Sequence, residues 1–586
     1  IFAMLASYLL SRTLVPTMAN YLLSSHTEPL DDNNPSMLLR LHQQFESHFE
    51  HFRTHYRSTL TWALQNANPF MIGFMAFMLA SLLLLWPTLG SNFFPNVDAG
   101  QIKLVIRAPT GTRVEETARL ADQVDAFIRK IIPPQDLDSL VDNIGLPISG
   151  INLSYSNSAT VGPENFDILI SLKKGHQPST DYIRKLRNEL PLAFPGVSVA
   201  FLPADIVNQI LNFGLPSPIN IQIMGSNIDE NRRYAYSLMS RLKHIPGIVD
   251  TRTRQAYNYP ALLVKTDRSH AKELGLTQLD VANNLLISLS GSLQTTPNFW
   301  VDPKNGVSYP LVTQAPQYVM NSLQALKNIP ITTPSMDNPL QLLGALTDIT
   351  PTWLPVVVSH YNVQPVIDIF AAVQDRDLGA VAADINALIK ETKTQLPRGS
   401  QIVVHGQIET QQNAFTELYI GLMFSILLIY LLIVINFQSW TDPFIILMGL
   451  PAALAGITWM LFITHTTLSV PALTGAIMCM GVATANSILV ISFARTHLES
   501  GHDPFASALT AGITRIRPVL MTALAMIIGM LPMAIGWGEG GEQNAPLGRA
   551  VIGALIFATV ATLLFVPTLF CVIHTRRQRS HQGQQA

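Results

Sequence analysis

The sequence predicts a mixed fold, in which an α/β region is joined to a polytopic α-helical membrane domain. Apolar runs of about 20 residues, the length that crosses a bilayer as a helix, lie toward both ends of the chain. Between them hydrophobicity falls for roughly 320 residues, which is too long for a loop and predicts folded domains. The chain of 586 residues is 48% hydrophobic and 13% charged, with a mean hydropathy of +0.28, as expected of a membrane protein.

The composition argues against several other classes of protein. The net charge of -2 provides no basic field for binding nucleic acid. The two cysteines, Cys479 and Cys571, both fall in apolar runs, so neither a disulfide framework nor a thiolate metal site is expected. No P-loop, HExxH, nucleophile-elbow or redox motif occurs, so we expect neither an enzyme nor a bound cofactor.

About six transmembrane helices are expected, and the first is interpreted as the end of a truncated span within residues 1–23. The others fall in segments 67–90 and 411–575, joined by short links except for a longer one over Ala494–Arg517. Their apolar runs are Pro69–Leu89, Phe415–Ile435, Pro443–Ile463, Pro471–Phe493, Pro518–Trp537 and Leu547–Ile573.

The span Pro471–Phe493 differs from the others because it contains no charged residue or histidine but several small and hydroxyl-bearing ones. Small residues allow helices to approach closely, and hydroxyl and amide groups form hydrogen bonds across the contact. We therefore expect this helix to lie inside a bundle. A packed helix with no further task is the alternative interpretation.

Residues 24–66 are polar and contain a predicted amphipathic helix that would lie at the membrane interface. Its apolar side chains recur at steps of three and four, which places them on one face. They are Leu38, Leu41, Phe45, Phe49, Phe52 and Tyr56. His48, His51 and His55 share a side, but no carboxylate or cysteine completes a ligand set, so a solvated face is preferred over a metal site.

The α/β region shows an internal repeat of strand, helix and returning strand. Ile102, Leu104 and Ile106 alternate with polar residues as in a half-buried strand, and Thr112–Glu115 fits a capping box before a helix. Further strands are expected at 166–172, 219–224, 366–372 and 402–404, with Pro-Gly turns after the helices. Such units predict split βαβ, ferredoxin-like subdomains over 91–215 and over 216–256 with 363–410. Residues 257–362, rich in proline and loops, are interpreted as an insert.

Basic residues predict the orientation in the membrane. They are Arg40, Arg53 and Arg57 in the amphipathic segment, Arg495, Arg515 and Arg517 before one span, and Arg576, Arg577 and Arg579 in the tail 576–586. Counting spans places all of them on one side, which the positive-inside rule makes cytoplasmic. The α/β region is then expected outside.

Five short motifs together resemble the C-terminal half of a resistance-nodulation-division (RND) transporter of the hydrophobe/amphiphile efflux type. The motifs are Phe94–Gly100 followed by Ala108–Thr112, Phe437–Phe444, Gly481–Leu489, Arg515–Thr522 and Gly541–Ala545. The resemblance implies a trimeric antiporter of the bacterial inner membrane that uses the proton gradient to extrude drugs or other amphiphilic compounds. It also implies two porter subdomains, a docking subdomain at 257–362, a periplasmic adaptor and an outer-membrane channel.

The resemblance also implies a proton relay, with one departure from the family's pattern. In drug-efflux members a lysine on the tenth helix pairs with two aspartates on the fourth, and the matching position here is Ala485. Arg515 and Thr522 match other relay members, and Asn486 lies beside the missing lysine. Arg515 is alternatively a cytoplasmic anchor, which is the preferred reading of Arg517.

Other functions stay open at this stage. A metal-ion exporter of the same superfamily is one alternative, although Met224, Met239, Met320 and Met336 are scattered along the sequence. A secretion-related or lipid-handling relative is another, and a structural or receptor role is a third. The first two predict an acidic pair in a fourth helix that this sequence does not include.

Overall fold

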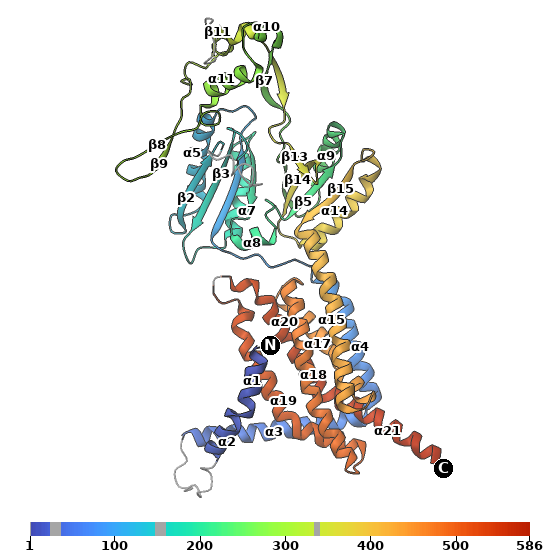
Figure 1. Cartoon of the computed structure of the whole chain (residues 1–586). Helices are drawn as coiled ribbons and strands as arrows, with labels where there is room; N and C mark the ends of the chain where they lie inside the picture. Colours follow the sequence, from blue (N-terminus) through green and yellow to red (C-terminus); the bar gives the residue numbers. More distant parts are fainter. Residues whose placement is uncertain (1, 24–36, 147–159, 333–339, 539, 586) are drawn as a thin grey trace.

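The computed structural model describes residues 2–23, 37–146, 160–332, 340–538 and 540–585, and it has two layers (Figure 1). One layer is a bundle of apolar helices, and the other contains two α/β units and an insert that extends away from the bundle. Among the described residues, six helices are long and apolar enough to cross a membrane. The predicted mixed fold is therefore confirmed, and each of the six apolar runs in 67–90 and 411–575 corresponds to one of these helices. The truncated span predicted within residues 1–23 forms two shorter helices, Phe2–Arg12 and Leu14–Leu23, which are not among the six.

The first α/β unit is a four-stranded antiparallel sheet in the order β2-β3-β1-β4. Its elements are β1 (Gln101–Arg107), α5 (Val114–Ile131), β2 (Leu137–Ile144), β3 (Asn165–Leu172), α7 (Ser179–Ala193) and β4 (Ser198–Leu202), followed by the short α8 (Ile206–Leu211). Both helices pack on one face of the sheet around Leu104, Ile168 and Leu186. This is the split βαβ arrangement that the sequence predicted.

The second unit has the same strand order but is built from two distant pieces of chain. Its elements are β5 (Ile219–Met224), α9 (Ile228–Leu242), β6 (Ile248–Thr253), β14 (Gln364–Val373), α14 (Leu378–Thr392), η2 (Lys393–Gln395) and β15 (Gln401–Gly406). The order is β6-β14-β5-β15, with β13 (Ser359–Tyr361) forming a hairpin on β14. The two later sequence repeats are thus halves of one sheet.

The insert leaves the second unit after β6 and returns at β13. Its elements are β7 (Tyr259–Thr266), α10 (Arg268–Glu273), α11 (Gln278–Ser290), β8 (Asn298–Val301), β9 (Ser308–Leu311), α12 (Leu323–Lys327), β10 (Pro330–Ile331), β11 (Gln341–Leu342), α13 (Leu343–Leu346) and β12 (Thr347–Leu354). The β8–β9 hairpin projects sideways (Figure 1), and its Phe299 and Trp300 side chains are exposed.

The bundle begins with α4 and its 3-10 extension and resumes after β15. Its elements are α4 (Ala67–Leu85), η1 (Trp86–Thr88), α15 (Gln407–Phe437), α16 (Thr441–Leu447), α17 (Leu450–Ile463), α18 (Val470–Glu499), α19 (Pro504–Ile535), η3 (Gly541–Gln543), α20 (Ala545–Val560), the π-helical η4 (Ala561–Phe565) and α21 (Val566–Gln585). α17 and α20 cross at Gly456 and Gly553, where a Cβ on either glycine would collide with the backbone of the other helix.

The predicted long link Ala494–Arg517 is wrong. α18 continues to Glu499 and α19 begins at Pro504, so only residues 500–503 connect them. Pro518 therefore lies inside α19 instead of at its start. The first turns of α19 are helical because Ser507, Ala508 and Gly512 pack there, with Gly512 beside Tyr56 and Leu60 of α3.

Of the N-terminal helices, α2 and α3 lie at the opposite end of the bundle from the α/β units, and α1 runs from that end back toward them (Figure 1). The three helices are α1 (Phe2–Arg12), α2 (Leu14–Leu23) and α3 (Met37–Gln65), the last being the predicted amphipathic helix. Leu60 and Leu64 are buried against the bundle, and the Tyr56 hydroxyl donates a 2.8 Å hydrogen bond to the carbonyl of Leu563 in the π-helical turn. The predicted face is only partly buried, because Phe45 and Phe52 remain exposed.

The predicted capping box at Thr112–Glu115 is also wrong. Arg113 is the N-cap of α5, and its side chain makes no capping hydrogen bond. The Thr112 hydroxyl instead donates to the carbonyl of Pro109 within the turn. The first turn is favoured by Glu115 and Glu116, whose charges complement the positive end of the helix dipole.

Candidate functional site

The predicted relay residues lie where α18 and α19 pack together. Asn486 is buried on α18, and its side-chain oxygen accepts a 3.0 Å hydrogen bond from the Thr522 hydroxyl of α19. The next residue, Ser487, makes a 2.9 Å hydroxyl contact with Thr562 of the π-helical turn. A polar line therefore crosses three helices inside an otherwise apolar bundle.

Arg515 lies two turns before Thr522 on α19 and has no carboxylate partner among the described residues. Its guanidinium carbon lies 4.9 Å from the centre of the Phe493 ring. Its Nε is buried and has no hydrogen-bond partner in the described part of the chain. Arg517 differs, since it reaches the Glu46 carboxylate of α3 at 3.3 Å and stacks on Phe49. The structure therefore ties Arg517 to the amphipathic helix.

Ala485 is exposed, and it lies on a face of α18 that no described element covers. The other exposed positions of this face follow helical spacing and are Thr474, Met478, Gly481 and Leu489. The opposite face is buried, with Gly475 beside the backbone of α20. The prediction that this helix lies inside a bundle is thus confirmed for one face.

A buried charge cluster that the sequence did not predict links four helices, α15, α16, α18 and α21. Asp442 of α16 contacts Nε2 of His574 at 3.1 Å and a guanidinium nitrogen of Arg495 at 3.4 Å. Arg495 also donates to the carbonyl of Phe437 at the end of α15. The carboxylate is 4% exposed and lies between the guanidinium of Arg495 and the imidazole of His574, so its oxygens have partners within the chain.

The two α/β units meet through a second satisfied charge cluster. Arg187 of α7 donates two hydrogen bonds to Asp250 of β6, from Nε at 3.0 Å and from Nη2 at 2.7 Å. The Asp250 side chain is 3% exposed and also accepts the backbone N–H of Phe201 in β4. A bidentate pair of this kind fixes position as well as charge, so it closes one side of the interface.

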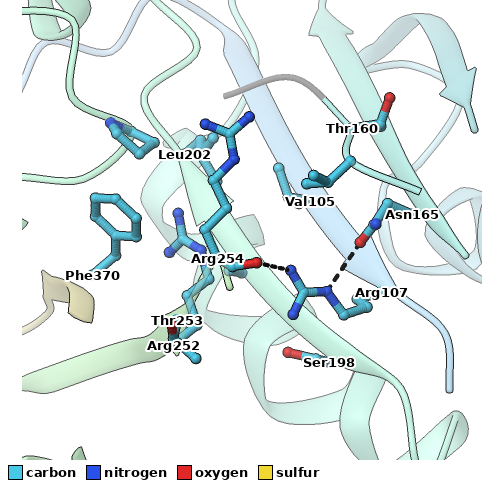
Figure 2. A pocket seen from close by; sticks show the side chains of 13 residues that line it. Val105, Arg107, Thr160, Asn165, Ser198, Leu202, Arg252, Thr253, Arg254 and Phe370 are labelled. Carbon is cyan, nitrogen blue, oxygen red and sulfur yellow. Dashed lines mark hydrogen bonds between the residues drawn. The ribbon is translucent and has the colours of Figure 1, made fainter. Parts of the chain in front are cut away.

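The other side of the same interface is a pocket of about 60 Å³ lined by three arginines (Figure 2). Arg107 comes from the end of β1, whereas Arg252 and Arg254 come from β6 and the residue after it. Arg107 donates to Asn165 Oδ1 at 3.0 Å and to the carbonyl of Arg254 at 3.0 Å. Both of these acceptors are neutral.

The pKa values of these arginines are lowered because little water surrounds the guanidinium groups. Burial lowers the pKa of Arg252 to about 10, an effect that Asp250 opposes and Arg107 reinforces. Burial also lowers the pKa of Arg107, against opposing attraction from Glu164. Arg252 stays charged at neutral pH. The guanidinium groups are therefore partly desolvated cations that repel one another.

A larger pocket of about 720 Å³ adjoins the arginine pocket and shares Arg254 and Phe370 with it. It lies between the second unit and the start of α15 and contains the 2.8 Å contact of His405 with Glu409. At its inner wall, Asp368 accepts hydrogen bonds from Gln222 at 2.9 Å and from Gln255 at 3.1 Å. Its wall is thus mixed in charge.

The described residues contain no group of three or more His, Cys, Asp or Glu side chains that could hold a metal ion. Of the four methionines considered in the sequence, Met224 and Met239 belong to the core of the second unit. Met320 packs in the core of the insert, and Met336 lies outside the described residues. The structure therefore does not bring the described three together.

Of the four predicted relay residues, the structure brings Asn486 and Thr522 together. Arg515 of α19 packs on Phe493, and Ala485 lies on the uncovered face of α18. Sequence reasoning missed the arginine pocket and both charge clusters. One signal was available, because Arg252 and Arg254 are two residues apart at the end of a strand and share a face. Their proximity to Arg107 depends on how the two sheets meet, which no local pattern reports.

Residues 1–574 match the AcrB/AcrD/AcrF family of RND permeases. This chain belongs to that family. The resemblance to RND transporters, stated from five motifs, is thereby confirmed for nearly the whole chain.

Curated relatives are similar along most of this chain. The cobalt-zinc-cadmium resistance protein CzcA of Cupriavidus metallidurans is 26% identical over 503 residues, which are 85% of this chain and 46% of that protein. The cation efflux system protein CusA of Escherichia coli is 25% identical and covers 86% and 48%, respectively. Protein HelA of Legionella pneumophila is 26% identical over 100% of this chain and 54% of its own length. The chain thus spans about half the length of these relatives.

A solved structure described as a heavy metal efflux pump, crystal form II, has the same fold. Its TM-score is 0.76 at 24% sequence identity, and the match covers 89% of this chain and 52% of that one. At this identity the likeness supports the fold alone.

Proposed function

We propose that this chain is the C-terminal half of an RND-type secondary transporter that exports substrates across the cell envelope. The family match over residues 1–574 carries this proposal, together with six apolar helices beneath a pair of α/β units of equal topology. In a complete pump the missing half would supply the remaining helices.

The two α/β units are proposed to be the porter subdomains, and the insert the docking subdomain. Pockets form preferentially at boundaries between subdomains, and both the arginine pocket and its larger neighbour lie at such boundaries. The projecting insert would meet a periplasmic adaptor and an outer-membrane channel in an inner-membrane homotrimer. This placement puts α3 and the Asp442–Arg495 cluster on the cytoplasmic side.

Proton coupling is proposed to run past Asn486 and Thr522. The uncovered face of α18 that contains Ala485, and the unpartnered Nε of Arg515, support the packing of another helix with acidic groups here. An alanine in place of a buried cation leaves those acidic groups without an internal counter-charge from α18. The chain by itself is therefore expected not to transport, because proton paths need intramembrane ionisable groups.

For the substrate, the relatives favour a different class from the amphiphilic drugs that the sequence motifs suggested. CzcA and CusA are named for cation resistance and efflux, which supports heavy-metal export as the class to test first. The multidrug reading has no comparable support. Metal ligands would have to come from the absent half or from outside the described residues, since the described residues contain no candidate cluster.

The test is transport by the complete protein in proteoliposomes with an imposed proton gradient. Zn²⁺, Co²⁺ and Cu⁺ are supplied separately, and the release of protons that accompanies uptake is recorded for each. Coupled movement of at least one ion is expected, and none is expected from this chain alone. Transport by the isolated chain would overturn the two-half proposal, and proton-independent movement would overturn the antiport.

A further inference from the structure

We propose that the arginine pocket between the two α/β units binds an anionic group of the transported substrate, with Arg107 and Arg252 as its recognition residues. This proposal rests on the proposed export function and specifies the chemistry of the species that passes the interface. It concerns residues of this chain only, so it is testable by binding as well as by transport.

The lining of the pocket is cationic. Among its 13 described lining residues are three arginines and no Asp, Glu, His, Cys or Met. The remaining walls are apolar or carry small neutral groups, such as Val105, Leu202 and Phe370. A site of this composition repels a bare metal cation and offers it no ligand. It suits a carboxylate, sulfate or phosphate group, which guanidinium groups bind through paired hydrogen bonds.

Arg107 and Arg252 have only neutral partners within the described part of the chain. Neither forms an ion pair within 4.0 Å with any described residue, in contrast to Arg187 at the same interface. Arg252 donates a long 3.4 Å bond to the carbonyl of Asp250 and lies 5.5 Å from the Phe370 ring centre. Partly desolvated cations without a counter-charge destabilise the closed interface, and a bound anion would remove that cost.

The carboxylates near the pocket all lie outside its described lining. Asp250 is held by Arg187, and Asp167 lies 3.5 Å from Lys103. Asp368 accepts hydrogen bonds from the side-chain amides of two glutamines. Glu164 attracts Arg107 through space but forms no ion pair with it. Arg107 and Arg252 therefore retain their attraction for an external anion.

The size of the pocket limits what enters it. A volume of about 60 Å³ limits the pocket to a small charged headgroup. The adjoining pocket of about 720 Å³ has room for the rest of an amphiphile and reaches it past Phe370. The ligand class is accordingly an anionic amphiphile. A metal would pass this interface only as a complex with net negative charge.

The experiment compares octyl sulfate with octyltrimethylammonium, which share a tail and differ in charge. Binding to the complete purified protein is measured by calorimetry, and export is measured in proteoliposomes. The variants are Arg107→Gln, Arg252→Gln and Arg252→Lys. Arg241→Gln is the matched control, because Arg241 pairs with Glu391 at 2.6 Å on the outer side of the second unit and lines neither pocket.

Octyl sulfate is expected to bind at least tenfold more tightly than octyltrimethylammonium. Each glutamine variant should weaken octyl sulfate binding about tenfold without changing the cation's affinity, since one charge-assisted hydrogen bond is lost. Arg252→Lys should keep part of the affinity, and Arg241→Gln all of it. Equal weakening of both ligands, or no headgroup preference, would overturn the proposal. If the glutamine variants fail to fold, the preference of the unmodified protein decides the question.

Failure of this proposal is distinguishable from failure of the proposed function. A protein that exports Zn²⁺ but does not prefer octyl sulfate overturns the anion site alone. A protein that binds octyl sulfate in the arginine pocket but couples no substrate movement to protons overturns the export function and supports the site.

Discussion

At the interface between the two α/β units, one half-buried arginine is paired with a carboxylate, whereas two others have no carboxylate partner among the described residues. On one side Arg187 is held by both oxygens of Asp250, at 2.7 and 3.0 Å. On the other side Arg107 and Arg252 face a pocket whose described lining contains no carboxylate. A cation that is paired within the chain fixes a structure, whereas a cation left with neutral partners is available to something outside the chain.

The same contrast appears in the membrane bundle. Arg495 contacts Asp442, which also binds His574, and this cluster is complete within the chain. Arg515 stacks on Phe493 and has a buried Nε without a partner among the described residues. We therefore expect Arg495 to support folding and Arg515 to support a task that needs the missing half.

The largest expected effect is loss of efflux on changing Arg515. Arg515→Ala in the complete protein should abolish proton-coupled export while leaving expression and trimer assembly intact, because only an unpaired charge is removed. Arg515→Lys should restore little, since a point charge does not replace the planar guanidinium. Export assays and size-exclusion chromatography measure the two properties separately. Normal export by Arg515→Ala would return this residue to a cytoplasmic anchor.

The second effect tests the paired side of the interface by stability. Asp250→Asn leaves Arg187 without its counter-charge and should destabilise the contact between the α/β units by about 3 kcal/mol. Arg107→Gln removes a desolvated cation together with hydrogen bonds to neutral acceptors and should cost less, about 1 kcal/mol. Thermal unfolding and limited proteolysis of the complete protein compare the two. Equal destabilisation by both variants would remove the distinction between the paired and unpaired sides.

The third effect concerns movement at the pocket. Ala200→Cys and Thr253→Cys line the pocket from opposite units, and a short thiol cross-linker between them should block export. A reducible linker should allow recovery when it is cleaved. The native Cys479 and Cys571 are buried, and the protein without the two added cysteines, treated with the linker, is the control. Full export with the pocket cross-linked would show that this interface does not open during transport.

The smallest effect extends the comparison to carboxylates. Burial and the neighbouring Asp142 raise the pKa of Asp125 from 3.8 to about 6, so the folded protein binds this proton more tightly than the unfolded chain. Its contribution to stability is then fully present below pH 4 and is lost as the pH rises through 6. Asp125→Asn should raise the thermal midpoint at pH 7.5 and change it little at pH 4. The opposite sign would mean that Asp125 is stabilised as a carboxylate.

Much of the architecture follows from local sequence patterns. Apolar run length predicts the spans because a bilayer requires about 20 residues, and period-two alternation at Ile102, Leu104 and Ile106 predicts β1. The Pro-Gly turns after the helices predict the returning strands. The five short motifs, taken together, identify the family from the order of their residues.

The sequence alone did not determine where α19 begins or which charges lie together. The apolar run starts at Pro518, but the helix starts at Pro504, because α3 packs against its small residues and stabilises the first turns. Asp442 and His574 are 132 positions apart, and Arg107 and Arg252 come from different sheets. Local periodicity reports which face of an element is buried. Only the packing of one element against another decides whether a buried arginine finds a carboxylate, and hence whether it holds the fold together or remains available to a ligand.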